Sequence, residues 1–526
     1  MAVSDEKTAD TDLIQRSLQR LVDYGVKHRL IEVTDRRWAY NQLLSYLHLT
    51  EPGCSAVWEN ADPKPEEDLQ DSLTPLIDTA VTNNCVEDST AGRARAQAGL
   101  MGILTPRPSE MNRHFNEFVT EGDPKAATDW FYKLSCDNAY VQRTAIAKNI
   151  AWSTDTDWGT IEITINLSKP EKDPRDITAA VKPHTQESYP ACQLCMTNEG
   201  YAGRSAQDPA GPHPERQNLR IIRIPLGGES WGLQYSPYAY FNEHCIAMSP
   251  IHRVMHVDRE NMGRLLDFVD LFPHYFIGSN ADLPIVGGSI LSHDHFQGGA
   301  HVFAMMKAEV SKSFSLDQYK DVQFDILKWP MTVIRLTSTN RAHLLDAATH
   351  IHEVWKTYSD PSVSIVAQDP DGTRHNTVTP VARKQGDTYT LYLALRCNIT
   401  TLDYPLGVFH PHQKLHHIKK ENIGLIEVMG LAILPPRLKN ELAAVQQTIN
   451  AYHNDADELK HQLHDNPLTV SHAEWAEKIA QKYDHVTTDI IHKEVSEVFV
   501  QVLLDAGVFK WDEQGRSALG RFVDKL

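Results

Sequence analysis

The chain of 526 residues carries 51 basic and 69 acidic side chains, which leaves a formal net charge of −18 at pH 7. Its 41% hydrophobic and 23% charged residues are ordinary for a globular protein and argue against disorder as the main state. A surface this acidic repels phosphate backbones and anionic lipids, which argues against binding to nucleic acid or to a membrane surface. A local basic pocket could still hold a small phosphorylated ligand.

The length suggests three or four structural units, at roughly 150 residues per domain. No uninterrupted apolar run approaches the roughly 18 residues that cross a bilayer. The first ten residues are acidic and polar, unlike a signal peptide. The seven cysteines are an odd number, unlike the cysteines of a secreted disulfide scaffold. We therefore expect a reduced, soluble protein in the cytoplasm.

The first part of the chain, over residues 12–152, is mainly helical in pattern. Asp12 is expected to cap the first helix. The apolar face of that helix would contain Leu13, Leu18, Leu21, Val22 and Val26. The stretch 124–150 predicts two more amphipathic helices. None of these elements carries chemistry by itself.

The pattern changes at Ile161, where apolar and polar residues begin to alternate as on a strand with one buried face. A helix is expected over 258–272. Further strands are expected over 219–224, 238–248, 285–303, 332–336, 363–368 and 388–396. From Glu421 the pattern is helical again, first over 421–434 and then to the C-terminus.

The strands thus come in blocks between two helical regions. A doubly wound parallel sheet would instead alternate strand and helix regularly. This order predicts an α+β fold: a mostly antiparallel sheet core, an N-terminal helical region and a C-terminal helical tail. The sequence has no P-loop, no dinucleotide-binding glycine fingerprint and no G-x-S-x-G nucleophile elbow.

The densest chemistry lies at residues 292–301, Ser-His-Asp-His-Phe-Gln-Gly-Gly-Ala-His. On a strand, residues two apart share a face, so His293, His295 and Gln297 would line one side of it. Three polar groups on one face of an otherwise apolar strand would be costly to bury without partners, which favours a functional site over a merely structural one. The following Gly298 and Gly299 allow a bulge or the close approach of a ligand.

Such a row can carry out group transfer at phosphorus. A neutral imidazole is a good nucleophile near pH 7, since its ordinary pKa is about 6.5. It can attack phosphorus and form a covalent phosphoramidate. The uncharged amide of Gln297 could hold a phosphoryl oxygen without over-stabilising the intermediate.

Cys192 and Cys195 form a C-x-x-C pair, which is either a metal knuckle or a redox pair. The turn residues that follow it favour the knuckle, because a redox pair of the thioredoxin type begins a helix. A site with four ligands then needs two histidines, and His252 and His293 are the candidates. Two buried cysteines without a metal remain the alternative.

Four segments together resemble the galactose-1-phosphate uridylyltransferases of the second, longer class, a family of the histidine-triad superfamily. The segments are 127–135, 189–204, 231–244 and 287–299, and the similarity extends to about Leu438. The resemblance implies a duplicated histidine-triad-like core. It divides the chain into an N-terminal helical region, a first half with the active site, a second, degenerate half and a helical tail, at 1–155, 156–345, 346–437 and 438–526.

The family resemblance also implies a reaction and its partners. The uridylyl group of UDP-glucose would pass to galactose 1-phosphate, giving UDP-galactose and glucose 1-phosphate, by a ping-pong route through a uridylyl-histidine. UDP-glucose and a hexose 1-phosphate would be the small-molecule partners, and a homodimer is a further expectation.

Site roles follow from the resemblance residue by residue. His295 matches the nucleophile, and Gln297 matches the amide that contacts the phosphoryl group. Asn280 resembles an asparagine that contacts the nucleotide phosphates, and Asn242 is a candidate for the nucleotide pocket. The metal ligands of the family's other class, expected here to hold a structural Zn²⁺, match Cys192, Cys195, His252 and His293.

This chain also departs from the family's first class. Asp294 stands where that class has the proline of its His-Pro-His motif, and Phe296 follows the nucleophile. A literal His-Pro-His occurs instead at 410–412, but position 414 is Lys, so the supporting glutamine is missing. We interpret 410–412 as structural or as a second metal site, not as the nucleophile.

Two rival functions remain open on the sequence. One is a dinucleoside polyphosphate phosphorylase or hydrolase of the same superfamily, which would consume different nucleotides. The other is a non-catalytic module that binds sugar nucleotides, which would bind its ligand without any exchange.

Overall fold

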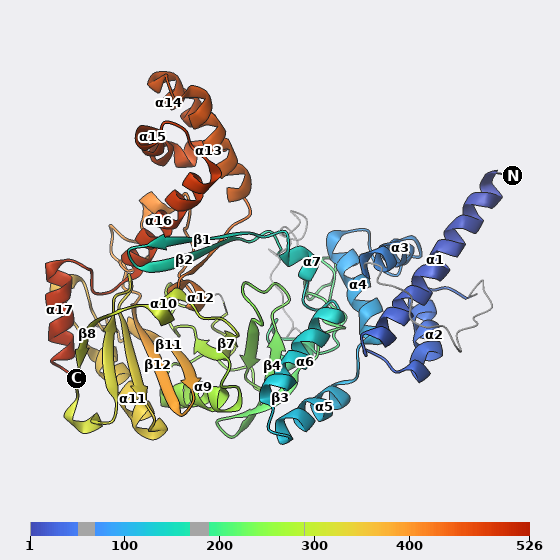
Figure 1. Ribbon diagram of the computed structural model, residues 1–526, viewed down its shortest axis with the longest axis horizontal. Helices are drawn as coiled ribbons and strands as arrows, with labels where there is room; N and C mark the ends of the chain where they lie inside the picture. The colour runs from blue at the N-terminus through green and yellow to red at the C-terminus, as the bar shows by residue number, and fades with distance from the viewer. Residues whose placement is uncertain (1, 51–68, 169–188, 289) are drawn as a thin grey trace.

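The computed structural model describes residues 2–50, 69–168, 189–288 and 290–526, with the side chains described from residue 12 onward (Figure 1). An N-terminal group of helices lies at one end of the molecule, and C-terminal helices project from the other. The N-terminal group consists of α1 (Ala2–Lys27), α2 (Arg36–Tyr46), α3 (Leu69–Thr82), α4 (Thr90–Leu104), α5 (Pro108–Thr120), α6 (Pro124–Asp137) and α7 (Arg143–Ile146).

A ten-stranded sheet forms the centre of the fold, and all of its strand pairings are antiparallel. Its order is β3-β4-β5-β7-β6-β11-β12-β10-β9-β8. The strands are β3 (Ile222–Leu226), β4 (Glu229–Tyr235), β5 (Cys245–Met248), β6 (Phe276–Ser279), β7 (His295–Gly299), β8 (Val310–Phe314), β9 (Gln323–Leu327), β10 (Val333–Ser338), β11 (Asn376–Gln385) and β12 (Thr388–Cys397).

The strand order contains the same unit twice. The order β3-β4-β5-β7-β6 recurs as β8-β9-β10-β12-β11, and the two units join where β6 pairs with β11. In each unit a helix precedes the strand that is fourth in chain order. The helix α9 (Arg259–Leu271) comes before β6, and α11 (Arg341–Thr357) comes before β11. By this topology, β12 is the counterpart of β7.

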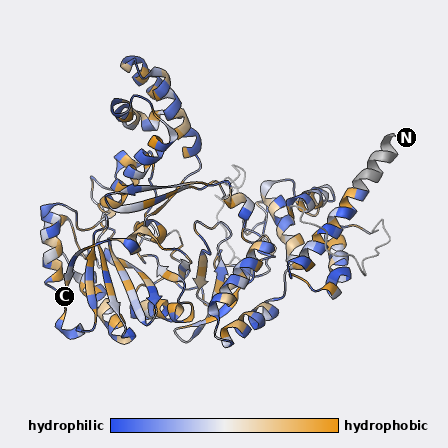
Figure 2. Ribbon diagram, in the orientation of Figure 1, coloured by the Kyte–Doolittle hydropathy of each residue, from blue (hydrophilic) through white to orange (hydrophobic). Residues whose placement is uncertain are grey.

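Hydrophobic side chains cover both faces of the sheet. Successive strand residues point to opposite sides, so neighbours in one strand belong to different clusters. Leu393 of β12 belongs to the core cluster formed with α9, α11 and the N-terminal helices, whereas the adjacent Tyr392 belongs to a second cluster on the opposite face. Figure 2 shows hydrophobic residues along the strands and mixed hydropathy along the helices.

The second cluster packs under a smaller sheet and the C-terminal helices. The small sheet has the order β1-β2-β13, in which β1 (Ile150–Thr156) pairs antiparallel and β13 (Leu431–Leu434) parallel with β2 (Gly159–Ile165). The short helices are α10 (Ala304–Lys307) and α12 (Leu425–Val428), and the tail consists of α13 (Leu438–Tyr452), α14 (Ala456–Asp465), α15 (Ala473–Lys482), α16 (Thr488–Ala506) and α17 (Glu513–Val523).

The α+β class, the duplicated and mostly antiparallel core, and the helical regions at both ends are confirmed. The division into four segments stays a prediction. The strand order favours a boundary of the two halves between β7 and β8, because the second unit begins with β8. The expected boundary, 345/346, lies within α11 of that unit. None of the helices in the described part of the chain is both long and apolar enough to cross a membrane.

Several predicted elements were wrong in extent. Asp12 lies inside α1, which begins at Ala2, so it does not cap that helix. The strand expected over 285–303 is limited to β7, and that over 238–248 to β5.

Two predicted elements were wrong in kind. The segment 363–368 is a turn around the left-handed Ser364 (φ 60°), and not a strand. The helix expected over 421–434 is a single turn, α12. Gly430, at φ 105°, then lets the chain reverse into β13, a conformation that glycine adopts without a Cβ clash.

Candidate active site

The short central strand β7 presents two of the predicted site residues on one face. His295 and Gln297 lie two apart on this strand, so their side chains project from the same side. Between them Phe296 points to the opposite side and stacks on Trp231, with ring centroids 4.8 Å apart and an interplanar angle of 9°. The alternation of buried aromatic and functional residues therefore fixes the direction of the two functional side chains.

The ring of His295 is held by one nitrogen only. Its Nδ1 lies 2.7 Å from the main-chain oxygen of His293, to which it donates a hydrogen bond. No described residue is a hydrogen-bond partner of Nε2, so that atom carries the free lone pair of the neutral ring. Burial lowers the pKa of His295 to about 4, which keeps the ring neutral at pH 7. A neutral ring with an available Nε2 lone pair can act as a nucleophile.

Four predicted metal ligands come together from three separate segments. Their ligand atoms all lie within 4.8 Å of one another. The distances are 3.6 Å between the sulfurs of Cys192 and Cys195, 3.3 Å from Cys192 Sγ to His293 Nδ1, and 3.2 Å from Cys195 Sγ to His252 Nδ1. Two thiolates at about 2.3 Å from a tetrahedral Zn²⁺ would lie roughly 3.8 Å apart, so the Cys₂His₂ donor set fits a structural zinc ion.

The ring of His293 is oriented for this cluster. Its Nε2 donates to the main-chain oxygen of Ser249 at 3.0 Å, which leaves Nδ1 as the lone-pair atom facing the sulfurs. A metal-bound histidine commonly makes this kind of outer hydrogen bond. Since the carbonyl of His293 also accepts the bond from His295, one residue connects the cluster to the candidate nucleophile.

Asp294, which replaces proline, is held by charge. Its carboxylate lies 3.3 Å from Arg253 Nε, and Arg253 makes two further bonds of 2.7 Å to Glu229. Its main chain donates to the Arg253 carbonyl and accepts from Ser249 N. These bonds restrain the backbone between the two histidines where the first class uses a proline ring. The Arg253 guanidinium lowers the pKa of Glu229 to about 2.

The two asparagines predicted for substrate binding differ in their surroundings. Ser279 pairs with Phe296, so the next residue, Asn280, projects from the same face as His295. Asn280 is buried, and its Oδ1 accepts from Leu425 N at 2.9 Å. Asn242 is exposed and donates to Glu243 Oε1 at 3.0 Å.

The two glycines after the candidate nucleophile serve the fold. A Cβ on Gly298 would lie 2.4 Å from the Phe276 carbonyl oxygen, and one on Gly299, at φ 146°, would lie 2.4 Å from that of Glu243. The close approach expected here is thus made by neighbouring main chain, which packs against both glycines.

The literal His-Pro-His lies outside the strand that corresponds to β7. It follows β12, which contains no histidine. His412 Nε2 faces the Val408 carbonyl at 3.1 Å and Nδ1 faces Asp505 at 3.3 Å, so both ring nitrogens point at oxygen acceptors. In the described part of the chain, the four ligands above form the single group with a metal-binding arrangement, and His410 and His412 are not in it.

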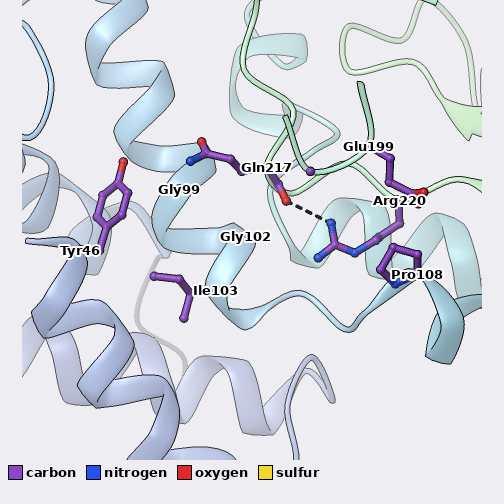
Figure 3. A pocket seen from close by; sticks show the side chains of 9 residues that line it. Tyr46, Gly99, Gly102, Ile103, Pro108, Glu199, Gln217 and Arg220 are labelled. Atoms are coloured by element: carbon purple, nitrogen blue, oxygen red, sulfur yellow. Dashed lines mark hydrogen bonds between the residues drawn. The ribbon is translucent and has the colours of Figure 1, made fainter. Parts of the chain in front are cut away.

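The cavity of about 450 Å³ in Figure 3 lies elsewhere. It is open and lies between α2, α4 and the segment around Arg220, whose guanidinium is turned to main-chain carbonyls. Neither the candidate nucleophile nor the metal ligands line it.

Sequence reasoning missed one residue of the site, His244. Its Nε2 lies 3.0 Å from Gln297 Oε1, although the two residues are on different segments. The residue closes the segment 231–244, but a single histidine before a strand gives no periodic signal. Its partner could be recognised only from the pairing of β5 with β7.

Comparison with known proteins assigns most of the chain. A family model described as "Galactose-1-phosphate uridyl transferase, N-terminal domain" matches residues 22–253, and one described as "Galactose-1-phosphate uridyl transferase, C-terminal domain" matches residues 268–476.

Full-length relatives point to the same family. A galactose-1-phosphate uridylyltransferase of Pediococcus pentosaceus is 47% identical over 496 residues, covering 94% of this chain and 96% of its own. That of Bacillus subtilis is 46% identical over 513 residues, 97% of each chain. The crystal structure of yeast Ap4A phosphorylase Apa2 is 10% identical with a TM-score of 0.32, over 64% of this chain and 94% of its own, and a likeness this low supports no conclusion. By its family models and relatives, the chain belongs to the galactose-1-phosphate uridylyltransferase family.

Proposed function

We propose that this protein transfers the uridylyl group of UDP-glucose to galactose 1-phosphate, with His295 as the nucleophile. The observation that carries the proposal is the hydrogen bond of the His295 ring from Nδ1 to the His293 carbonyl, with Nε2 left without a partner among the described residues. Burial keeps this ring neutral and therefore nucleophilic.

The reaction balances in two half-reactions. His295 Nε2 attacks the α-phosphorus of UDP-glucose; a P–N bond forms, the bond to the bridging oxygen breaks, and glucose 1-phosphate leaves with the electron pair. A phosphate oxygen of galactose 1-phosphate then attacks the same phosphorus, and the electron pair of the P–N bond returns to Nε2. Each step inverts phosphorus, so the overall result is retention. The route is ping-pong, with one site serving both sugar phosphates in turn.

Gln297 is assigned to the phosphoryl oxygens. It is half-buried beside His295, and its Oε1 is already engaged by His244. The amide N–H groups thus remain to stabilise negative charge that develops on the α-phosphoryl group. Asn280, on the same face, is assigned to the nucleotide phosphates, and the exposed Asn242 to the nucleotide pocket.

Zn²⁺ is proposed as the structural ion of Cys192, Cys195, His252 and His293. The donor set, the mutual distances and the hydrogen bond of His293 to Ser249 support it. The ion would hold together three segments of the chain and so stiffen the carbonyl of His293 that orients the nucleophile. It would supply structural stability, and the chain's own histidine would supply the chemistry.

The proposal extends to partners and location. UDP-glucose and a hexose 1-phosphate are the proposed ligands, and a homodimer in the cytoplasm is the proposed setting. The net charge of −18 supports the absence of nucleic-acid and membrane partners.

An isotope-exchange experiment tests the function. The protein is incubated with UDP-glucose and radiolabelled glucose 1-phosphate alone, and then with galactose 1-phosphate. We expect label to enter UDP-glucose before galactose 1-phosphate is added, and UDP-galactose to form afterwards. Exchange only with galactose 1-phosphate present would refute the covalent route. Binding without exchange or transfer, or consumption of dinucleoside polyphosphates instead, would refute the function.

A further inference from the structure

His244 is a buried histidine that neither the metal cluster nor the nucleophile uses. It is 2% exposed and directly precedes β5, whose first residue, Cys245, pairs with Gly298 of β7. This pairing brings the ring to the side chain of Gln297, with 3.0 Å between His244 Nε2 and Gln297 Oε1. Gln297 makes no other side-chain hydrogen bond to a described residue.

The position of His244 is fixed on several sides. Its main-chain N–H donates to the Phe241 carbonyl at 3.3 Å, and its carbonyl accepts from Ser236 N at 2.7 Å. The ring packs on the ring of Phe241, with centroids 4.5 Å apart and an interplanar angle of 31°. The imidazole therefore has little freedom to follow a moving partner, and can itself restrain one.

The buried ring nitrogens decide which way the hydrogen bond runs. His244 Nδ1 is buried, and no described residue is its hydrogen-bond partner. A buried N–H without an acceptor is rarer in proteins than an acceptor without a donor, so the proton belongs on Nε2. Burial lowers the pKa of His244 to about 4, so the ring is neutral and carries that single proton.

The direction of this bond sets the orientation of the amide. Nε2–H of His244 donates to Gln297 Oε1, which turns the amide nitrogen of Gln297 away from His244. If the amide were reversed, it would offer the phosphoryl group an oxygen, and the contact would repel. An unrestrained glutamine would also lose side-chain entropy each time it met the substrate.

We propose that His244 is a positioning residue for the uridylyl transfer: it holds the Gln297 amide so that its N–H groups face the phosphoryl site beside His295. This inference rests on the proposed function for what the amide stabilises. The restraint itself is a property of the free protein.

The test uses two substitutions of His244 and a double-mutant cycle. His244→Phe keeps a ring against Phe241 but has no N–H, whereas His244→Gln places an amide N–H near the position of Nε2. We expect His244→Phe to lower kcat by about 10- to 100-fold, less than the loss of a whole phosphoryl donor, with KM for both substrates nearly unchanged. His244→Gln should recover most of the lost kcat.

The matched background is Gln297→Ala, in which there is no amide to position. There, His244→Phe should change kcat by less than about twofold, because coupled residues are non-additive. Equal losses in both backgrounds would overturn the positioning role. So would a loss of kcat that follows a loss of melting temperature and that His244→Gln does not restore.

Crystal structures of the free wild-type protein and of His244→Phe provide a readout independent of activity. The Gln297 amide should keep one orientation in the wild type and adopt another, or several, in the variant. An unchanged Gln297 in the variant would overturn the inference, whether or not the enzyme transfers uridylyl groups. Failure of the wild type to make UDP-galactose would instead overturn the proposed function.

Discussion

Two short histidine segments, 293–295 and 410–412, differ in what holds their rings. In the first segment the second histidine, His295, donates from Nδ1, and none of the described residues bonds to its Nε2. In the second, His412 faces the Val408 carbonyl with Nε2 and Asp505 with Nδ1. The second segment matches the tripeptide of the family's first class letter for letter, yet both nitrogens of its last ring are turned toward oxygen atoms of the protein.

The segments also differ in their place in the duplicated fold. His295 begins β7, while the counterpart strand β12 has no histidine, and the His-Pro-His follows it in a loop. The loop is attached to the tail, where Lys510 lies over the ring of Phe409 at 5.3 Å. The partners of the ring nitrogens, and not the tripeptide itself, therefore distinguish a candidate nucleophile such as His295 from a structural histidine such as His412.

The largest expected effect comes from replacing the second histidine of each segment, first His295 and then His412. His295→Ala should lower kcat/KM by roughly 10⁴-fold or more, which is about 5 kcal/mol at 1.36 kcal/mol per factor of ten. His412→Ala should keep kcat and KM within a small factor of wild type. Coupled assays of UDP-galactose formation measure both. Near-normal turnover of His295→Ala would remove the distinction between the segments.

A second effect concerns the metal, which we assign to the cluster of Cys192, Cys195, His252 and His293 and not to the segment 410–412. Cys195→Ser should abolish stoichiometric zinc, measured by elemental analysis of protein prepared without a metal-affinity tag. Loss of the ion should cost about 3 kcal/mol or more of stability, or roughly 6–12 °C in melting temperature for a unit of 150–250 residues.

The control for this variant is Cys85→Ser, since Cys85 is half-buried and outside the cluster. It should leave the zinc content unchanged. Fully active wild-type protein that contains no zinc would show that the four residues are only part of the core.

A third effect tests whether the contact between His412 and Asp505 is structural. Asp505→Ala removes the contacts of Asp505 Oδ2 with the main-chain N–H and the ring of His412, at 3.2 and 3.3 Å. We expect it to lower the free energy of unfolding by about 2 kcal/mol, the usual contribution of a hydrogen bond to a charged group, without changing kcat. Urea unfolding measures it, with Lys493→Ala, an exposed position on the same helix, as the control. A large loss of kcat at normal stability would give the second segment a role in catalysis.

Part of the candidate site could be predicted from the sequence. The rest could not be predicted, and the reason is physical. The spacing of His295 and Gln297 predicted a shared strand face, and the C-x-x-C predicted a ligand pair. His244 and Arg253, the partners of Gln297 and Asp294, lie 53 and 41 positions away from them in the chain, so no local pattern reports these contacts. Hence the bonds from His244 to Gln297 and from Asp294 to Arg253 appeared only in the structure.

The sheet was predicted in class but not strand by strand. β11 was missed because it is mostly polar and contains Pro380, a residue that argues against a central strand. Pro380 is accommodated where β11 pairs with β12, and pairing with β6 covers only Val381 and Ala382. The strand β8 was missed because four of its five residues are exposed at the edge of the sheet. Tertiary pairing, and not local pattern, decides such strands.

The smallest expected effect concerns a third pair of histidines, which joins the loop after 410–412 to the tail. His417 Nδ1 lies 2.9 Å from His472 Nδ1, and His472 Nε2 lies 3.0 Å from Glu441. Burial, with the nearby His472 and Arg437, lowers the pKa of His417 to about 3. The unfolded chain therefore binds a proton below pH 6.5 that the folded chain binds only near pH 3, so acid destabilises the fold between these two pH values.

Replacing His417 by Asn should reduce the loss of unfolding free energy between pH 7.5 and 5.5 by about 1.4 kcal/mol, measured by urea titration at each pH. His461→Asn, at an exposed position on α14, should leave that loss unchanged, and an equal effect of both variants would show that the buried pair does not carry it.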